Sequence, residues 1–134
     1  MNSIVEETGA QEAHKDYLSI CTNAVSETLG ELTLRHGEAL LARSRDRIDA
    51  NLELMRAFAD EHAGRLTWYD PSGGPVGLVT LKGESAEAHS ERVRVEGGVL
   101  LVPATLFDLD DAHLRIGLGR ADFAQALEAW ERVI

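Results

Sequence analysis

The chain has 134 residues, of which 44% are hydrophobic and 27% are charged, and its formal net charge is −10. This length suits one domain with its own core, and the composition is ordinary for a globular protein in water. Nucleic acids and anionic membranes attract basic surfaces, so the acidic balance argues against both as partners.

The N-terminal stretch, residues 1–14, contains few large apolar side chains, and we expect it to be a flexible lead-in. It has neither the basic region nor the apolar core of a signal peptide. No apolar run in the chain is long enough to span a bilayer. Cys21 is the single cysteine, which excludes an internal disulfide and fits a reducing compartment. We therefore expect a cytoplasmic protein.

Two amphipathic helices are predicted next. Residues 23–35 carry apolar side chains at spacings of four and three, and Asn23 or Ser26 can cap that helix. Residues 38–63 carry a longer apolar stripe, and Gly64 follows where a helix end belongs. At 1.5 Å per residue the second helix is about 39 Å long, which is long for so small a chain. We expect a helix of this length either to span the domain or to run past it toward a second body.

Four short strands are predicted beyond Gly64. Residues 65–81 alternate in polarity on either side of a Pro/Gly-rich loop, which indicates an antiparallel hairpin. Residues 99–102 form a buried third strand that Pro103 ends, and residues 114–118 form the fourth.

Two further helices complete the pattern, one over residues 85–95 and one over residues 123–134. Asp122 and Gln125 can form a capping box for the last helix. Helices on one face of a small, mostly antiparallel sheet of about four strands make an α+β sandwich, and this is the predicted fold class.

Few side chains suggest catalysis or metal binding. Three aspartates and a histidine lie in residues 107–113, but the glycine and the distal glutamate of a calcium loop are missing. The five histidines form no HxxxH or HxH pair, so we predict no metal site. Lys15 lies in the lead-in and Lys82 at a strand end, which makes both surface residues rather than Schiff-base lysines. We predict no catalytic residue in this chain.

Arg115 lies in the middle of the fourth predicted strand. Burying an unpaired charge costs several kcal/mol. Arg115 therefore needs either an internal carboxylate, which the 23 acidic residues can supply, or an anion from outside. The guanidinium fork fits a carboxylate through two parallel hydrogen bonds. Residue spacing alone does not decide between an internal carboxylate and an anion from outside.

Residues 15–134 resemble the last third of class I/II pyridoxal-phosphate-dependent aminotransferases, the aspartate aminotransferase fold. The matching stretches come in family order. The first is KDYLSICTNAVSE, which resembles the segment after the cofactor-lysine region. The second is LLARSRDRIDANLELMRAFADEHAGRLTWYDPSGGPVGLVTLKG, which resembles the long inter-domain helix and the following hairpin. The third is EGGVLLVPATLFDLDDAHLRIGLGR, which resembles the family pattern GVLVVPGSxFG…HxRIGFGR.

The resemblance implies roles for individual residues. Arg115 stands where the family's arginine binds the α-carboxylate of the substrate. Thr22 and Asn23 match a segment near the cofactor phosphate of a neighbouring subunit. Arg120 matches a structural residue at the start of the last helix. Ala104 departs from the family, which often has glycine there, so the shape of the carboxylate pocket is expected to differ.

The family's large domain, with its cofactor lysine and its ring-binding residues, has no counterpart in this chain. The start of the chain does not resemble the preceding family segment, which favours a genuine N-terminus. The leading hypothesis is a free-standing small domain of a split amino-acid-transforming enzyme, active with pyridoxal phosphate (PLP) only in complex with a separate large-domain chain. The alternative is a non-catalytic relic or interaction module that self-associates, or that binds a protein or an amino acid without chemistry.

Overall fold

The structure, a computed structural model, describes residues 23–134. The predictions for residues 1–14, Cys21 and Thr22 lie outside this range. The chain divides into two compact units, residues 1–40 and residues 41–134.

In the first unit, helix α2 spans Ala24–Arg35. The side chain of Asn23 accepts a hydrogen bond from the backbone N–H of Val25 at 2.9 Å, so the predicted Asn23 cap is confirmed. No residue of α2 is buried, and its apolar stripe of Val25, Leu29 and Leu32 is exposed. Within residues 23–134, nothing covers this stripe.

Helix α3, Gly37–Glu61, is the longest element. Its buried side chains all lie in its second half, and they are Asn51, Met55, Phe58 and Ala59. In the first half, Leu40 and Leu41 are exposed. Gly64, beyond the helix end, does not have the left-handed conformation expected of a helix-ending glycine.

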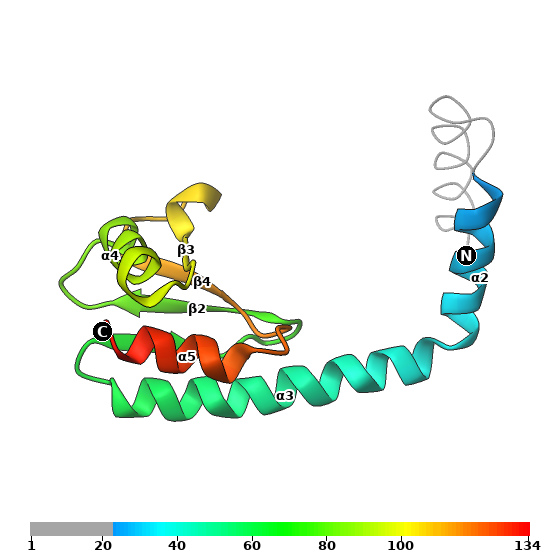
Figure 1. Ribbon diagram of the computed structural model, residues 1–134, viewed down its shortest axis with the longest axis horizontal. Helices are drawn as coiled ribbons and strands as arrows, with labels where there is room; N and C mark the ends of the chain where they lie inside the picture. Colours follow the sequence, from blue (N-terminus) through cyan, green and yellow to red (C-terminus); the bar gives the residue numbers. More distant parts are fainter. Residues whose placement is uncertain (1–22) are drawn as a thin grey trace, which may run out of the picture. The chain divides into compact units, whose positions relative to one another are not determined.

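The sheet has four strands, which are β1 (Leu66–Tyr69), β2 (Val76–Leu81), β3 (Val102–Pro103) and β4 (His113–Gly117). All neighbours are antiparallel, in the order β1-β2-β4-β3 (Figure 1). The predicted hairpin is confirmed as β1 and β2. The third strand is shorter than predicted, and Pro103 is its last residue. An edge strand tolerates proline, because the missing N–H can face away from the ladder.

The helices around the sheet are α4 (Ala86–Arg92), its π-helical continuation η1 (Val93–Gly97), the 3-10 turn η2 (Ala104–Phe107) and α5 (Phe123–Glu131). The predicted α+β fold class is confirmed.

One prediction about the last helix is wrong, because the side chain of Asp122 makes no capping hydrogen bond. It accepts two from the guanidinium of Arg120 instead, at 2.8 and 2.6 Å. The ion pair with this nearby arginine competes successfully for the same carboxylate.

The strand register gives the sheet two different faces. One face joins side chains of α3, α4, η1 and α5 in a single core. Its strand residues are Leu66, Val79, Leu81, Leu114 and Ile116, and the helical ones include Met55, Phe58, Val93, Phe123, Leu127 and Trp130. On the other face one residue from each strand forms a row across the sheet, in the order Tyr69, Leu78, Arg115, Val102.

We expect Gly77→Ala to destabilise the second unit by about 1–3 kcal/mol, as over-packing does in other cores. A Cβ at Gly77 would lie 2.1 Å from Cη2 of Trp68, so the indole would have to leave its place on the sheet. Denaturant unfolding measures the change. Gly64→Ala is the matched control, since a Cβ there meets nothing within 4 Å, and its stability should match or slightly exceed the original. Equal stability of the two variants would contradict the packing described here.

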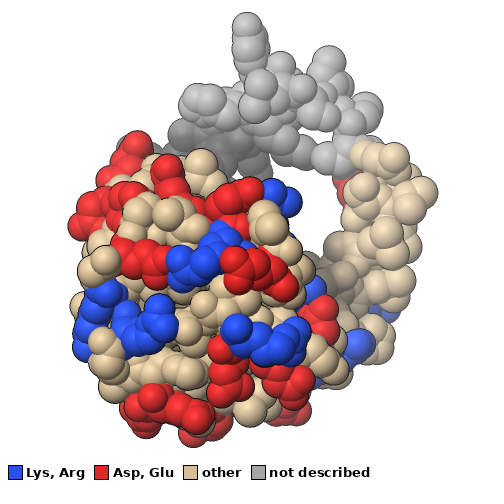
Figure 2. Space-filling model, turned by 60° about the vertical axis from the view of Figure 1, so that its left-hand side comes forward, with Lys and Arg blue, Asp and Glu red and all other residues tan. Residues whose placement is uncertain are grey.

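The surface of the molecule carries charges of both signs. Figure 2 shows Lys and Arg side chains interspersed with Asp and Glu over the face that it draws. Among residues 23–134, no helix combines the length and the apolar character that crossing a membrane requires.

Candidate functional site

Arg115 lies on the exposed face of the sheet, between Leu78 of β2 and Val102 of β3. Its neighbours in β4, Leu114 and Ile116, point into the core. Strand alternation therefore places the guanidinium of Arg115 outside the core. Within residues 23–134, no carboxylate forms an ion pair with Arg115.

An aromatic ring holds the Arg115 side chain. The Cζ atom of Arg115 lies 5.4 Å from the centre of the Phe107 ring, within the range of a cation–π contact. Phe107 ends η2, and the fully buried Ala104 begins this turn. The contact restricts the guanidinium without neutralising its charge. Sequence reasoning missed Phe107, because no periodicity predicts a single turn of 3-10 helix between two strands.

Arg115 also lines a pocket of about 630 Å³. The other walls come from residues 97–102, from the connection after β4, and from α5. Pockets of this size suit small molecules. Arg120 is a second arginine in the lining, but Asp122 neutralises it. The charge left for a ligand is that of Arg115, so the pocket is chemically suited to a small anion with an apolar part.

A buried amide fixes the connection after β4. The side chain of Asn51 in α3 donates to the backbone carbonyls of Leu118 and Arg120, each at 2.8 Å. Asn51 is one of only three buried polar residues in the described part of the chain. These bonds satisfy two backbone carbonyls directly after β4.

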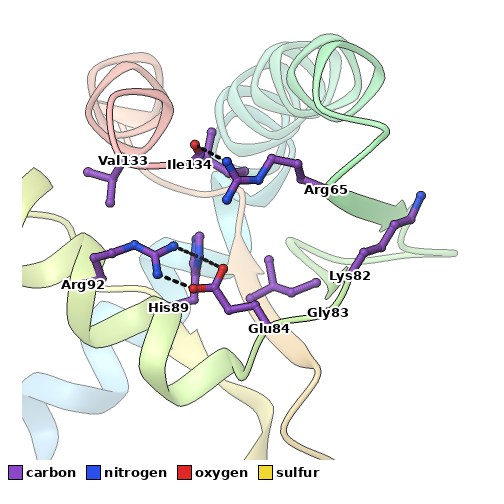
Figure 3. Close-up of a pocket in the computed structure, with 9 residues that line it drawn as sticks. Arg65, Lys82, Gly83, Glu84, His89, Arg92, Val133 and Ile134 are labelled. Carbon is purple, nitrogen blue, oxygen red and sulfur yellow. Dashed lines mark hydrogen bonds and ion pairs between the residues drawn. The ribbon is translucent and has the colours of Figure 1, made fainter.

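A second pocket, of about 460 Å³, lies where β2, α4 and the chain end meet (Figure 3). Its cations already have acceptors. Arg92 donates to the Glu84 carboxylate, Arg65 to the carbonyl of Ile134 at 2.7 Å, and Lys82 to the carbonyl of Ala63 at 2.6 Å. This pocket is therefore less suited to an anion than the pocket at Arg115.

The fully buried ring of His89 connects this pocket to the core. The indole N–H of Trp130 donates to Nε2 of His89 at 2.7 Å. An indole nitrogen can only donate, so Nε2 accepts and the ring proton sits on Nδ1, which is 2.9 Å from the Glu84 carboxylate. Burial lowers the pKa of His89, and the hydrogen bond from Arg92 lowers the pKa of Glu84 to about 2. The chain Trp130–His89–Glu84–Arg92, here called the His89 network, ties α5 to α4.

In the acidic loop between η2 and β4, Asp110 and Asp111 form hydrogen bonds with nearby groups of the loop and of α4. Asp110 accepts from the backbone N–H of Ala112 at 3.0 Å and contacts His113 at 2.5 Å. Asp111 accepts from the backbone N–H of Glu87 at 2.9 Å, at the start of α4. These carboxylates support the loop and the helix start.

The remaining predicted site residues are not tested by the geometry. The side chain of Asn23 caps α2, and Thr22 lies outside the described residues, so their phosphate-side role stays a prediction.

No protein-family model matches the sequence, and no curated protein does either. Solved structures do match the fold. A PLP-dependent aminotransferase from Streptococcus suis 89-1591 is similar with a TM-score of 0.79 and 23% identity, over 91% of this chain and 33% of that one. This chain has the fold of an aminotransferase small domain.

Two further structures support the match to this small domain. LysN, the α-aminoadipate aminotransferase of Thermus thermophilus, gives a TM-score of 0.76 at 23% identity, over 96% of this chain and 34% of that one. Kynurenine aminotransferase of Pyrococcus horikoshii gives a TM-score of 0.64 at 26% identity, over 90% of this chain and 31% of that one. The small domain thus spans about a third of the length of the proteins it resembles.

Proposed function

We propose that this small domain is one component of a split PLP-dependent enzyme that acts on amino acids, and that Arg115 binds the α-carboxylate of the substrate. The observation that carries the proposal is the state of Arg115 within residues 23–134. Its guanidinium is exposed, steadied by Phe107, without an ion-pair partner, and part of a pocket of ligand size. A fork of N–H donors held in this way fits a carboxylate.

The cofactor would be held mainly by another chain. Lys82 is the single lysine of residues 23–134, and its Nζ donates to the carbonyl of Ala63 at the surface. It therefore does not fit the part of a cofactor-binding lysine, which requires a desolvated pocket. PLP supplies an electron sink for carbanion chemistry when it is bound. The residues of this chain would bind and orient the amino acid beside it, in the cytoplasm.

Exposed apolar side chains favour a partner. Val25, Leu29 and Leu32 form a stripe on α2 that nothing in residues 23–134 covers, and Leu41 is exposed on α3. An exposed apolar stripe such as the one on α2 often marks an interaction site. The partner we propose is the large-domain chain that binds PLP.

Isolation of the tagged protein from its source cells is expected to recover a second protein that carries a PLP-binding lysine. The purified pair, supplied with PLP, should convert an α-amino acid to the 2-oxo acid, while neither protein does so alone. Leu29→Glu should abolish recovery of the second protein, because it places a charge in the exposed stripe. Glu38→Gln is the control that leaves the stripe intact.

A different outcome would support the alternative, a non-catalytic module. If light scattering shows a stable self-assembly of this chain and no PLP-binding protein accompanies it, the split-enzyme proposal is wrong. The same conclusion follows if the recovered pair turns over no amino acid.

A further inference from the structure

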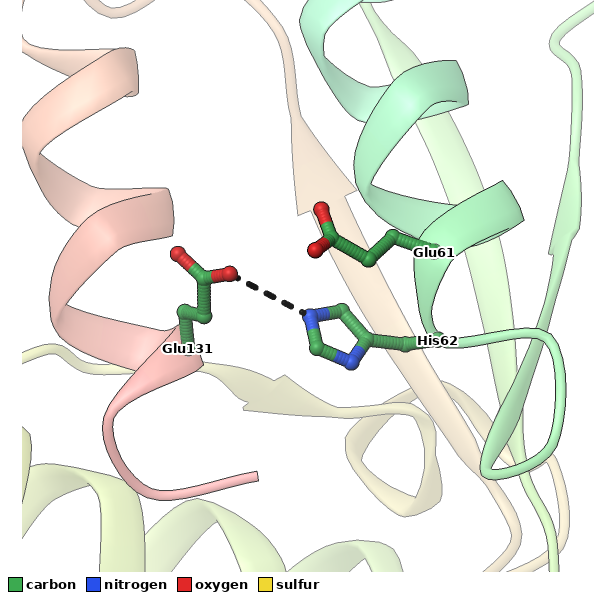
Figure 4. Close-up of side chains that lie close together, drawn as sticks. All are labelled: Glu61, His62 and Glu131. Atoms are coloured by element: carbon green, nitrogen blue, oxygen red, sulfur yellow. Dashed lines mark ion pairs between the residues drawn. The ribbon is translucent and has the colours of Figure 1, made fainter.

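Three possible metal ligands meet where α3 and α5 end. Glu61 is the last residue of α3, His62 follows it, and Glu131 is the last residue of α5 (Figure 4). One ligand atom from each of the three side chains lies within 4.8 Å of the other two. Figure 4 shows the imidazole directed toward Glu131, with the Glu61 carboxylate on the same side.

His62 is the unusual member of this group. Its side chain is only 17% exposed, and its ring packs against Phe58 with the ring centres 4.5 Å apart. The Nε2 atom is buried and has no hydrogen-bond partner. The nearest carboxylate oxygen, on Glu131, is 3.8 Å away, which is too far for a hydrogen bond. A buried nitrogen without a partner costs free energy, so its position calls for a ligand.

One of the three ligand-to-ligand distances is close to that expected around an ion, and the other two are within 4.8 Å. Zinc binds imidazole nitrogen and carboxylate oxygen at about 2.0–2.2 Å, so two ligands of one tetrahedral ion lie about 3.4 Å apart. The observed 3.8 Å between Nε2 and the Glu131 oxygen is close to this value. Both glutamates are exposed, so small rotations of their side chains can complete the geometry.

We propose that Glu61, His62 and Glu131 bind a divalent transition-metal ion of the zinc type. The two carboxylates neutralise the ion, the imidazole favours a transition metal over a hard cation, and water fills the fourth position. The ion ties the end of α3 to the end of α5. No sequence motif revealed the site, because Glu131 comes from the far end of the chain and only the fold brings it to His62.

The test is calorimetric titration of the full chain with zinc chloride, alongside thermal unfolding. Zinc is expected to bind and to raise Tm, whereas magnesium chloride should have no such effect. Glu61→Gln and Glu131→Gln preserve side-chain size, and each should weaken zinc binding at least about tenfold. His62→Gln should do the same, but it also removes the contact with Phe58.

Two controls separate this site from other zinc ligands on the chain. Glu128→Gln changes another glutamate of α5, and Asp110→Asn removes the partner of His113; both should bind zinc like the original protein. The proposal is overturned if zinc leaves Tm unchanged. It is also overturned if both glutamate variants bind zinc normally, or if Asp110→Asn weakens binding as much as they do.

Discussion

If the proposed complex of this small domain with a PLP-binding chain forms, Arg115→Ala is expected to lower its kcat/KM for an α-amino acid by about 10²- to 10³-fold. Truncating one partner of a buried charge pair costs about 2–5 kcal/mol, and about 1.4 kcal/mol corresponds to a factor of ten. Arg115 is exposed in the small domain and makes no ion pair within residues 23–134, so its removal should leave the stability of the domain nearly unchanged.

Comparing substrates with and without an α-carboxylate tests whether Arg115 binds this group. Turnover of a primary amine that lacks the α-carboxylate should be similar in the Arg115→Ala variant and in the original complex. Arg115→Lys keeps the charge but loses the fork, so its kcat/KM should be intermediate. Arg94→Ala, which removes an exposed arginine paired with Glu91, is the control and should have no effect. Equal losses for the amino acid and the amine would show that Arg115 has a structural role instead.

The free energy of unfolding is expected to fall as the pH falls below about 6.5, by up to about 1.4 kcal/mol per pH unit. Burial lowers the pKa of His89 in the folded protein, so the unfolded chain binds this proton first and acid favours unfolding. Protonation of Glu84 also lowers the free energy of unfolding, but at lower pH, because the folded pKa of Glu84 is about 2 and its ordinary value is 4.5. Denaturant unfolding between pH 7 and pH 5 therefore isolates the effect of His89.

His89→Gln should reduce this slope, because an amide does not titrate in this range, although the amide oxygen can still accept from Trp130. The exposed His36 provides the control, and His36→Gln should keep the original slope. Trp130→Phe should cost about 1–3 kcal/mol at pH 7, since it leaves the Nε2 atom of His89 buried without its donor. An unchanged slope in His89→Gln would contradict the assignment to the His89 network.

Local signals in the sequence were enough for the order of the elements. Alternation around a Pro/Gly loop predicted the β1–β2 hairpin, and the predicted helix over residues 85–95 is present as α4 and η1. The errors arose where two local signals compete. The third strand was expected over residues 99–102 but spans only Val102–Pro103, and Asp122 was expected to cap α5 but pairs with Arg120.

The surroundings of the candidate site depend on contacts between distant segments, which a single sequence does not contain. Arg115 could be singled out because a charge in a strand is unusual. Phe107 and Asn51 could not, because neither the cation–π contact nor the two carbonyl bonds follow from periodicity. The His89 network was missed for the same reason, since Trp130 reaches it from the last helix.

The side-chain amide of Asn51 connects α3 to the backbone that follows β4. The amide donates hydrogen bonds to the carbonyls on both sides of Gly119, directly after the strand that carries Arg115. In the first half of the same helix, Leu41 is exposed. A partner that docks on the first half and turns α3 about its axis would pull on that backbone, and so shift the guanidinium relative to the pocket. The side-chain amide of Asn51 is the contact through which such a movement would reach the end of β4.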